Sequence, residues 1–144
     1  MKNDAIILVV EADDPSYELI EINLQRSGIC NGILRFKDAK GLLEFLFDPQ
    51  AADLAQGKRS YLLILDCLES MDVLERIKQD DDLGKIPVVM LTDSDERVDV
   101  SRCHELGCST YLVKPKDQAE FASAVQKIGL FLSVVEVPEV GSVG

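Results

Sequence analysis

Short apolar runs alternate with amphipathic stretches along the chain. Five runs rich in Leu, Ile or Val have the length and composition of buried strands. Each run is followed by a stretch whose apolar residues recur at helical spacing, as do Tyr17, Ile20 and Leu24. The pattern predicts strands over 5–11, 32–36, 61–66, 86–92 and 109–114, and helices over 14–28, 38–47, 69–79, 94–107 and 117–132.

Strands that alternate with helices predict an α/β fold, in which right-handed crossovers place helices on both faces of a parallel sheet. We therefore expect a three-layer, five-stranded parallel sheet of the flavodoxin-like type. The first helix has its own end signals, because Asp14 can cap it, Pro15 suits its first turn and Gly28 suits its end. The pattern divides the chain into one domain, 1–132, and a mixed tail, 133–144, that we expect to be less ordered.

Length and charge narrow the class of protein. The 144 residues are 47% hydrophobic, which suits one domain with a substantial core. The net charge of −11 argues against nucleic acid or an anionic membrane as a direct partner. No apolar run reaches the roughly 18 residues of a spanning helix, and no export signal is evident, so we expect a cytoplasmic protein with reduced thiols.

Polar side chains stand where the predicted strands end, and such ends meet at one edge of a parallel sheet. Carboxylates gathered there would suit Mg²⁺. A carboxylate held beside Mg²⁺ and a lysine could attack a phosphoryl group, whose charge the two cations would offset. The residues concerned are Glu11, Asp13 and Asp14 after the first strand, Asp66 after the third, Thr92 after the fourth and Lys114 after the fifth.

These strand ends carry a family resemblance. The ordered segments "DDP", "LLILD", "VVMLT" and "YLVKP" resemble the receiver domain of two-component response regulators, over about residues 5 to 132. The resemblance implies that Asp66 is the phosphoacceptor, that Lys114 binds a phosphoryl oxygen, and that Thr92 and Tyr111 are switch residues. It also implies a Mg²⁺ site made by Asp13, Asp66 and the backbone carbonyl of Leu68, with Glu11 or Asp14 as a further ligand.

The implied activity is signalling rather than catalysis on an outside substrate: a histidine kinase would phosphorylate Asp66. The connection before "YLLILD" and the ending "LFLSVVEVPEV" resemble single-domain receivers that serve bacterial phytochromes, which suggests a phytochrome-type kinase. Because 12 residues follow residue 132 in this sequence, we expect no output domain there. We therefore expect a homodimer built on the last helix and the tail, whose apolar residues cannot all face one core; a tail folded over its own domain is the alternative.

Two departures from the family pattern leave a second interpretation open. The position before Asp13 is Ala12 rather than an acid, and the segment after Asp66, "DCLESMDVLERIK", lacks the usual Pro and Gly and is shorter. A pseudo-receiver would keep the fold as a protein-interaction module without phosphotransfer. A flavodoxin-like enzyme or nucleotide binder is disfavoured, because no Gly-rich phosphate loop follows the first strand. The pattern "CHELGC" is a poor match to a metal site.

Overall fold

The computed structural model describes residues 5–48, 59–66, 70–92, 97–134 and 137–140. Strands and helices alternate as predicted from the sequence. In chain order they are β1 (Ile6–Glu11), α1 (Asp14–Arg26), β2 (Ile33–Phe36), α2 (Ala39–Leu46), β3 (Arg59–Asp66), α4 (Ser70–Lys78), the 3-10 turn η1 (Leu83–Lys85), β4 (Val88–Thr92), α5 (Arg97–Leu106), β5 (Thr110–Val113), α6 (Gln118–Val134) and β6 (Glu139–Val140).

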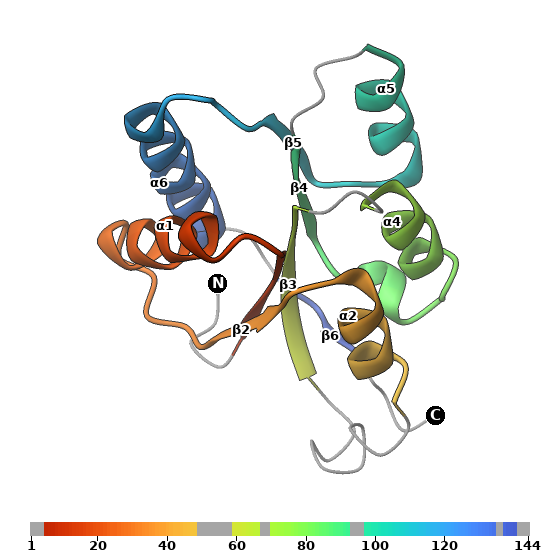
Figure 1. Ribbon diagram of the computed structural model, residues 1–144. Coiled ribbons are helices and arrows are strands. Elements are labelled where there is room, and N and C mark those ends of the chain that lie inside the picture. Colours follow the sequence, from red (N-terminus) through yellow and green to blue (C-terminus); the bar gives the residue numbers. More distant parts are fainter. Residues whose placement is uncertain (1–4, 49–58, 67–69, 93–96, 135–136, 141–144) are drawn as a thin grey trace.

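The sheet has the order β2-β1-β3-β4-β5, and all four of these pairings are parallel. Figure 1 shows α1 and α6 on one face of the sheet and α2, α4 and α5 on the other. The three-layer, five-stranded fold predicted from the sequence is thus confirmed. In register, Glu11 at the end of β1 lies opposite Asp66 at the end of β3.

Helices cover both faces of the central strand β3, and its sequence is therefore a continuous apolar run. Every side chain from Tyr61 to Leu65 is at most 2% exposed. Alternate residues enter two cores: Leu63 and Leu65 pack under α2, α4 and α5, whereas Leu62 and Ile64 pack under α1 and α6. Asp66 follows directly on this run, at the point where the apolar burial of β3 ends.

The first two helices begin at aspartates. The N-cap of α1 is Asp13 rather than the predicted Asp14: its side chain accepts a hydrogen bond from the Ser16 amide at 3.0 Å. Asp38 caps α2 in the same way through the Gly41 amide at 2.8 Å. Beyond α1, Gly28 adopts a φ of 97°, a left-handed conformation that favours glycine and stops the helix.

Gly129 lets α6 pack closely on the end of α1. The helix α6 continues through this glycine to Val134. A Cβ placed on Gly129 would lie 2.7 Å from the Cβ of Ser27 and closer still to its hydroxyl oxygen. Rotating the serine side chain cannot relieve the first of these contacts. Glycine is therefore explained here by close helix packing rather than by flexibility.

The described part of the tail is more ordered than the sequence suggested. Residues 139–140 form β6, which pairs antiparallel with the start of β3 through Arg59 and Ser60. Val137 and Val140 are buried, one against each core. The tail thus folds back over its own domain, the alternative noted above, and it does so at the edge opposite the ends of β1 and β3.

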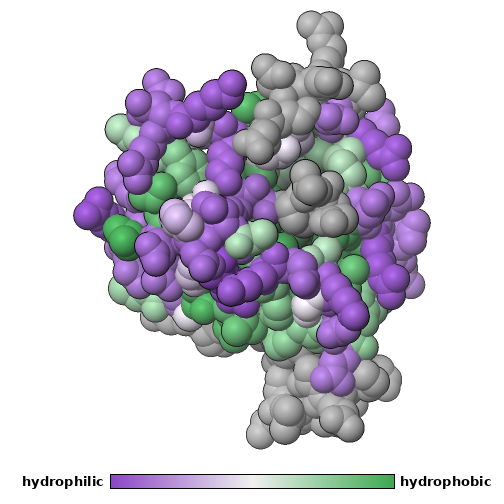
Figure 2. Space-filling view, in the orientation of Figure 1, coloured by the Kyte–Doolittle hydropathy of each residue, from purple (hydrophilic) through white to green (hydrophobic). Residues whose placement is uncertain are grey.

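The visible surface is mainly hydrophilic, with smaller apolar areas between the charged side chains (Figure 2). Acidic residues outnumber basic ones, 26 Asp and Glu against 15 Lys and Arg. Within the described parts of the chain, every helix is too short or too polar to span a bilayer. The largest exposures of apolar side chains are at the end of α6, at Val134 with 78% and Leu130 with 61%.

Candidate functional site

An ion pair joins two of the predicted site residues at the carboxyl edge of the sheet. The Nζ atom of Lys114 donates to Oδ2 of Asp66 at 2.6 Å. Lys114 directly follows β5, and its backbone amide donates to the carbonyl of Thr92 at 2.6 Å, which fixes where the side chain starts. Its ammonium also lies over the ring of Phe121, 5.4 Å from the centroid. Sheet register and α6 together hold the lysine against the acid.

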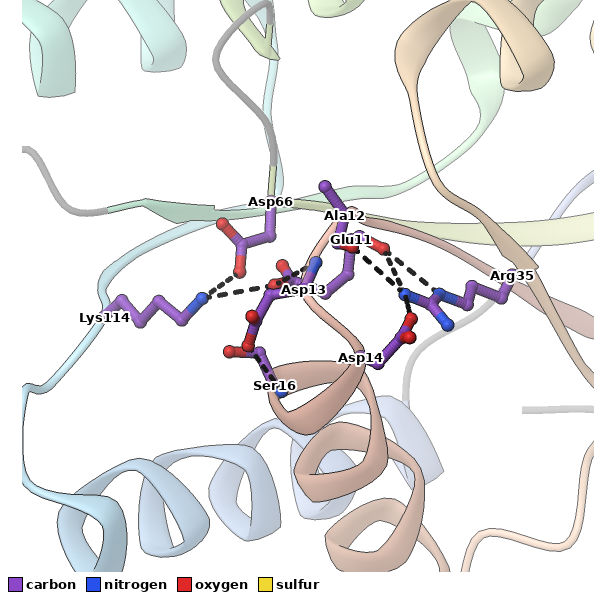
Figure 3. Close-up of polar contacts among 8 residues, drawn as sticks. All are labelled: Glu11, Ala12, Asp13, Asp14, Ser16, Arg35, Asp66 and Lys114. Carbon is purple, nitrogen blue, oxygen red and sulfur yellow. Dashed lines mark hydrogen bonds and ion pairs between the residues drawn. The ribbon is translucent and has the colours of Figure 1, made fainter.

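Glu11 is the second carboxylate in this group. It is only 3% exposed, and its Oε1 lies 3.5 Å from Nζ of Lys114. Its Oε2 is buried and finds no hydrogen-bond partner among the described residues. Burial, and then the adjacent carboxylate of Asp66, raise the pKa of Glu11 from 4.5 to about 8, although Lys114 opposes the shift. Figure 3 shows Glu11, Asp66 and Lys114 pointing toward one another.

This raised pKa predicts a pH-dependent stability in metal-free buffer. Between pH 4.5 and about 8 the folded state retains a proton on Glu11 that the unfolded chain has released. The free energy of unfolding should therefore fall as the pH rises through this window. Glu11→Gln removes the titration, so the variant should gain stability relative to the parent as the pH rises toward 8. Urea unfolding at several pH values, with a chelator present, measures both curves.

The matched control is Glu105→Gln, which changes an exposed carboxyl on α5. It should run parallel to the parent across the same pH range. Parallel curves for Glu11→Gln and the parent would contradict the assignment of a raised pKa to Glu11.

The other acids of the β1–α1 turn have different surroundings. The carboxylate of Asp13 is exposed, and its hydrogen bonds from Ser16 at the start of α1 lower its pKa. Asp14 points to the other side of the turn, where its Oδ1 lies 2.7 Å from Nη2 of Arg35, and this contact lowers the pKa of Asp14. Ala12 separates Glu11 from this pair. Among the acids of this turn, Glu11 is the one that lies opposite Asp66 in the sheet and pairs with Lys114.

Arg35, on β2, was not singled out from the sequence. Its Nε and Nη2 atoms donate to the carbonyl oxygen of Glu11 at 3.1 and 3.0 Å, and Nη2 also reaches the carbonyl of Ala12 at 3.4 Å. Its guanidinium stacks over the ring of Tyr17, 4.7 Å from the centroid. The only sequence signal was one arginine within the short apolar strand "ILRF". Figure 3 shows Lys114 and Arg35 on opposite sides of the acidic turn.

The two predicted switch residues lie on the same face of the sheet. Thr92 ends β4, two residues after Met90, and Met90 pairs in register with Tyr111 on β5. Tyr111 is half-buried and packs against the core under α2, α4 and α5. Lys114 lies two residues after Leu112, and Leu112 packs against the core under α1 and α6. The Thr92 hydroxyl and the Tyr111 ring thus belong to the α4–α5 side of the sheet.

The chemistry of the donors suits a hard divalent cation. Glu11 and Asp66 are carboxylates in register, and the unpartnered oxygen of Glu11 is available as a ligand. Within the described residues, no three His, Cys, Asp or Glu side chains are grouped closely enough to hold a metal by themselves. The predicted Leu68 carbonyl and the shortened segment after Asp66 lie outside the described residues.

Comparison with known proteins shows which proteins this chain is similar to. No established family profile matches the chain. It is 33% identical over 138 residues to the response regulator Rcp1 of Synechocystis sp., covering 92% of each chain. The receiver domain of a response regulator from Rhodospirillum rubrum superimposes with a TM-score of 0.86 at 33% identity, covering 95% of this chain and 99% of that one.

Two solved structures carry chemical detail in their names. The phosphorylated cyanobacterial phytochrome response regulator RcpA has a TM-score of 0.79 at 27% identity, covering 92% of this chain and 97% of its own. The Mn²⁺-bound form of Rcp1 has a TM-score of 0.79 at 31% identity, covering 92% and 98%. Our chain therefore belongs to the response regulator receiver family, the class of signalling domain that its sequence resembled.

Proposed function

We propose that this protein is a single-domain response regulator that a histidine kinase phosphorylates on Asp66. The observation that carries the proposal is the 2.6 Å contact between Asp66 and Lys114 at the carboxyl edge of the sheet. It holds a carboxylate at the point where strand burial ends, beside the cation that a phosphoryl group requires. The fold around it is the one that the family uses for this chemistry.

The transfer can be written from the residues present. An Oδ atom of Asp66 attacks the phosphorus of the kinase phosphohistidine, the O–P bond forms, and the N–P bond to the imidazole breaks. Lys114 then loses its direct contact with the carboxylate and pairs with a phosphoryl oxygen. Thr92 and Tyr111, on one face of the sheet, are the switch residues that respond to the new group.

Mg²⁺ is the cofactor that we propose, held by Asp66, by Asp13 or Glu11, and by the Leu68 carbonyl, with Asp14 turned away toward Arg35. When bound, the ion supplies positive charge opposite the phosphoryl oxygens. The Mn²⁺-bound form of Rcp1 supports a divalent cation in a related protein. The buried, unpartnered oxygen of Glu11 supports one here.

The direct test is intact-mass analysis after incubation with acetyl phosphate, with Mg²⁺ and with a chelator. We expect the mass of one phosphoryl group to be added only when Mg²⁺ is present. No added mass with acetyl phosphate or with a kinase would favour the pseudo-receiver, an interaction module without phosphotransfer. Ala12 and the shortened segment after Asp66 motivate this alternative.

The proposed partner is a histidine kinase in the cytoplasm, of the phytochrome type. Support comes from the relatives, because Rcp1 matches over 92% of its length and RcpA is named as a phytochrome response regulator. The net charge of −11 disfavours nucleic acid as a partner on electrostatic grounds. Phosphotransfer from purified phytochrome-type kinases, compared with kinases of other classes, tests this part of the proposal.

We also propose a homodimer built on the exposed side of α6; the tail, expected from the sequence to share this interface, pairs with its own domain through β6. Apolar side chains at the end of α6 remain exposed although α6 packs well on its inner side: Leu130 is 61%, Phe131 39% and Val134 78% exposed. Such a strip is typical of an interface, and two-fold dimers are the commonest assembly. Val137 is buried within its own domain, so the strip on α6 provides the main contact.

Light scattering checks this prediction. The parent chain should have the mass of a dimer at tens of micromolar, and Val134→Gln should shift the population toward monomer. Leu34→Gln, at an exposed apolar position on the edge strand β2, is the control and should remain dimeric. Point variants are preferred to truncation, because truncation after residue 132 would remove Val140 from the core. A monomeric parent chain would contradict the proposal.

A further inference from the structure

Arg35 contacts the acidic turn through both backbone and side-chain atoms of the turn. Its side chain is 19% exposed and donates to the carbonyl oxygens of Glu11 and Ala12. The same guanidinium pairs with the carboxylate of Asp14 and stacks on the ring of Tyr17. One side chain from β2 thus joins the end of β1 to the first turns of α1 (Figure 3).

These contacts fix the direction of the turn that follows β1. The Glu11 carbonyl cannot rotate without breaking two hydrogen bonds from the planar guanidinium, which fixes the peptide plane after Glu11. One longer bond, at 3.4 Å, also restrains the Ala12 carbonyl. The side chain of Glu11 is thereby aimed at Asp66 and Lys114. Asp14 is drawn to the far side, where Arg35 balances its charge.

We propose that Arg35 is a positioning residue for the cation and phosphoacceptor site: it holds the acidic turn so that Glu11 faces Asp66. This inference rests on the proposed function. Arg35 touches neither Asp66 nor Lys114 in the contacts described, so it acts through the backbone of residues 11 and 12. Partners one step removed from metal ligands characteristically set ligand orientation, and their loss weakens the site.

The test measures Mg²⁺ binding by calorimetry and the Mg²⁺ dependence of labelling by acetyl phosphate. In Arg35→Ala the dissociation constant for Mg²⁺ should rise about tenfold, the lower end of the range for loss of such a partner. The Mg²⁺ concentration for half-maximal labelling should rise by the same factor, while the rate at saturating Mg²⁺ stays near that of the parent. Arg35→Lys keeps the charge but not the planar fork, and should recover only part of the affinity.

Two controls separate positioning from charge and from stability. Lys37→Ala removes a cation that lies 4.0 Å from Asp14 but makes no described contact with the turn's carbonyls, and it should bind Mg²⁺ as the parent does. Ile77→Val shortens a fully buried side chain in the core under α2, α4 and α5. It therefore lowers the melting temperature without touching the turn. It should also keep the parent's affinity for Mg²⁺.

The outcomes are distinct. Equal Mg²⁺ affinity in Arg35→Ala and in a parent that is labelled on Asp66 overturns the positioning role and leaves the proposed function standing. An equal loss of affinity in Arg35→Ala and Ile77→Val also overturns it, since stability alone would then explain the effect. A parent that neither binds Mg²⁺ nor becomes labelled overturns the proposed function and this inference together.

Discussion

Asp66→Asn is expected to abolish phosphoryl labelling of the protein. The amide that replaces the carboxylate has no anionic oxygen to attack phosphorus, and among the described contacts of Lys114 the only other carboxyl group is that of the buried Glu11. The circular dichroism spectrum should not change, because the side chain sits at the strand end rather than in the core. Intact mass after acetyl phosphate and Mg²⁺ gives the result directly.

A suitable control for this variant is Asp80→Asn. Asp80 follows α4 and accepts hydrogen bonds from the amides of Asp82 and Leu83, at the edge of the sheet away from the site. An asparagine oxygen can accept the same bonds, so labelling should match that of the parent. Labelling that persists in Asp66→Asn would show that the phosphoacceptor has been assigned to the wrong residue.

Lys114→Ala should have the second largest effect. The ammonium is the only described cation within 4.0 Å of Asp66, and removing a preorganised charge from a developing phosphoryl anion typically lowers the rate by about 10²–10³. The initial rate of labelling by acetyl phosphate should fall by that factor at saturating Mg²⁺. Stability should also fall, by about 1–3 kcal/mol, because the variant leaves buried acidic oxygens without their donor.

Lys116→Ala tests whether charge alone is responsible. Lys116 is exposed and lies two residues beyond Lys114, so its loss changes the net charge equally without touching Asp66. Its labelling rate should equal that of the parent. If both variants lost the same activity, long-range attraction of the phosphoryl donor would explain the result, and the direct role of Lys114 would be wrong.

The sequence predicted the features that depend on periodicity. The apolar runs around Leu63 and Val89 reveal strands, and their alternation with helices implies a parallel sheet, so the pattern alone brings Asp66 and Lys114 to the same edge. Their contact at 2.6 Å agrees with that expectation. The rule used was simple: carboxyl ends of parallel strands share one edge.

The sequence could not predict the features that depend on side-chain geometry. The resemblance implied Asp13 as a partner of Asp66 in the site, but it did not reveal that Asp13 also caps α1 or that the register of β1 with β3 sets Glu11 opposite Asp66. Register matters because a shift of one residue in a strand reverses the side-chain direction. The hydrogen bonds of Arg35 and the contact of Gly129 with Ser27 join segments distant in sequence, and neither leaves a local pattern.

The pairing of β6 with β3 has a consequence for how the chain folds during synthesis. β3 carries Asp66, but the partners of its first residues, Glu139 and Val140, are made about 80 residues later. The ribosome must release residue 140 before Val137 and Val140 can close the two cores. Until then the start of the central strand offers unpaired backbone groups to other nascent chains, so we expect the domain to close only after residue 140 has left the ribosome.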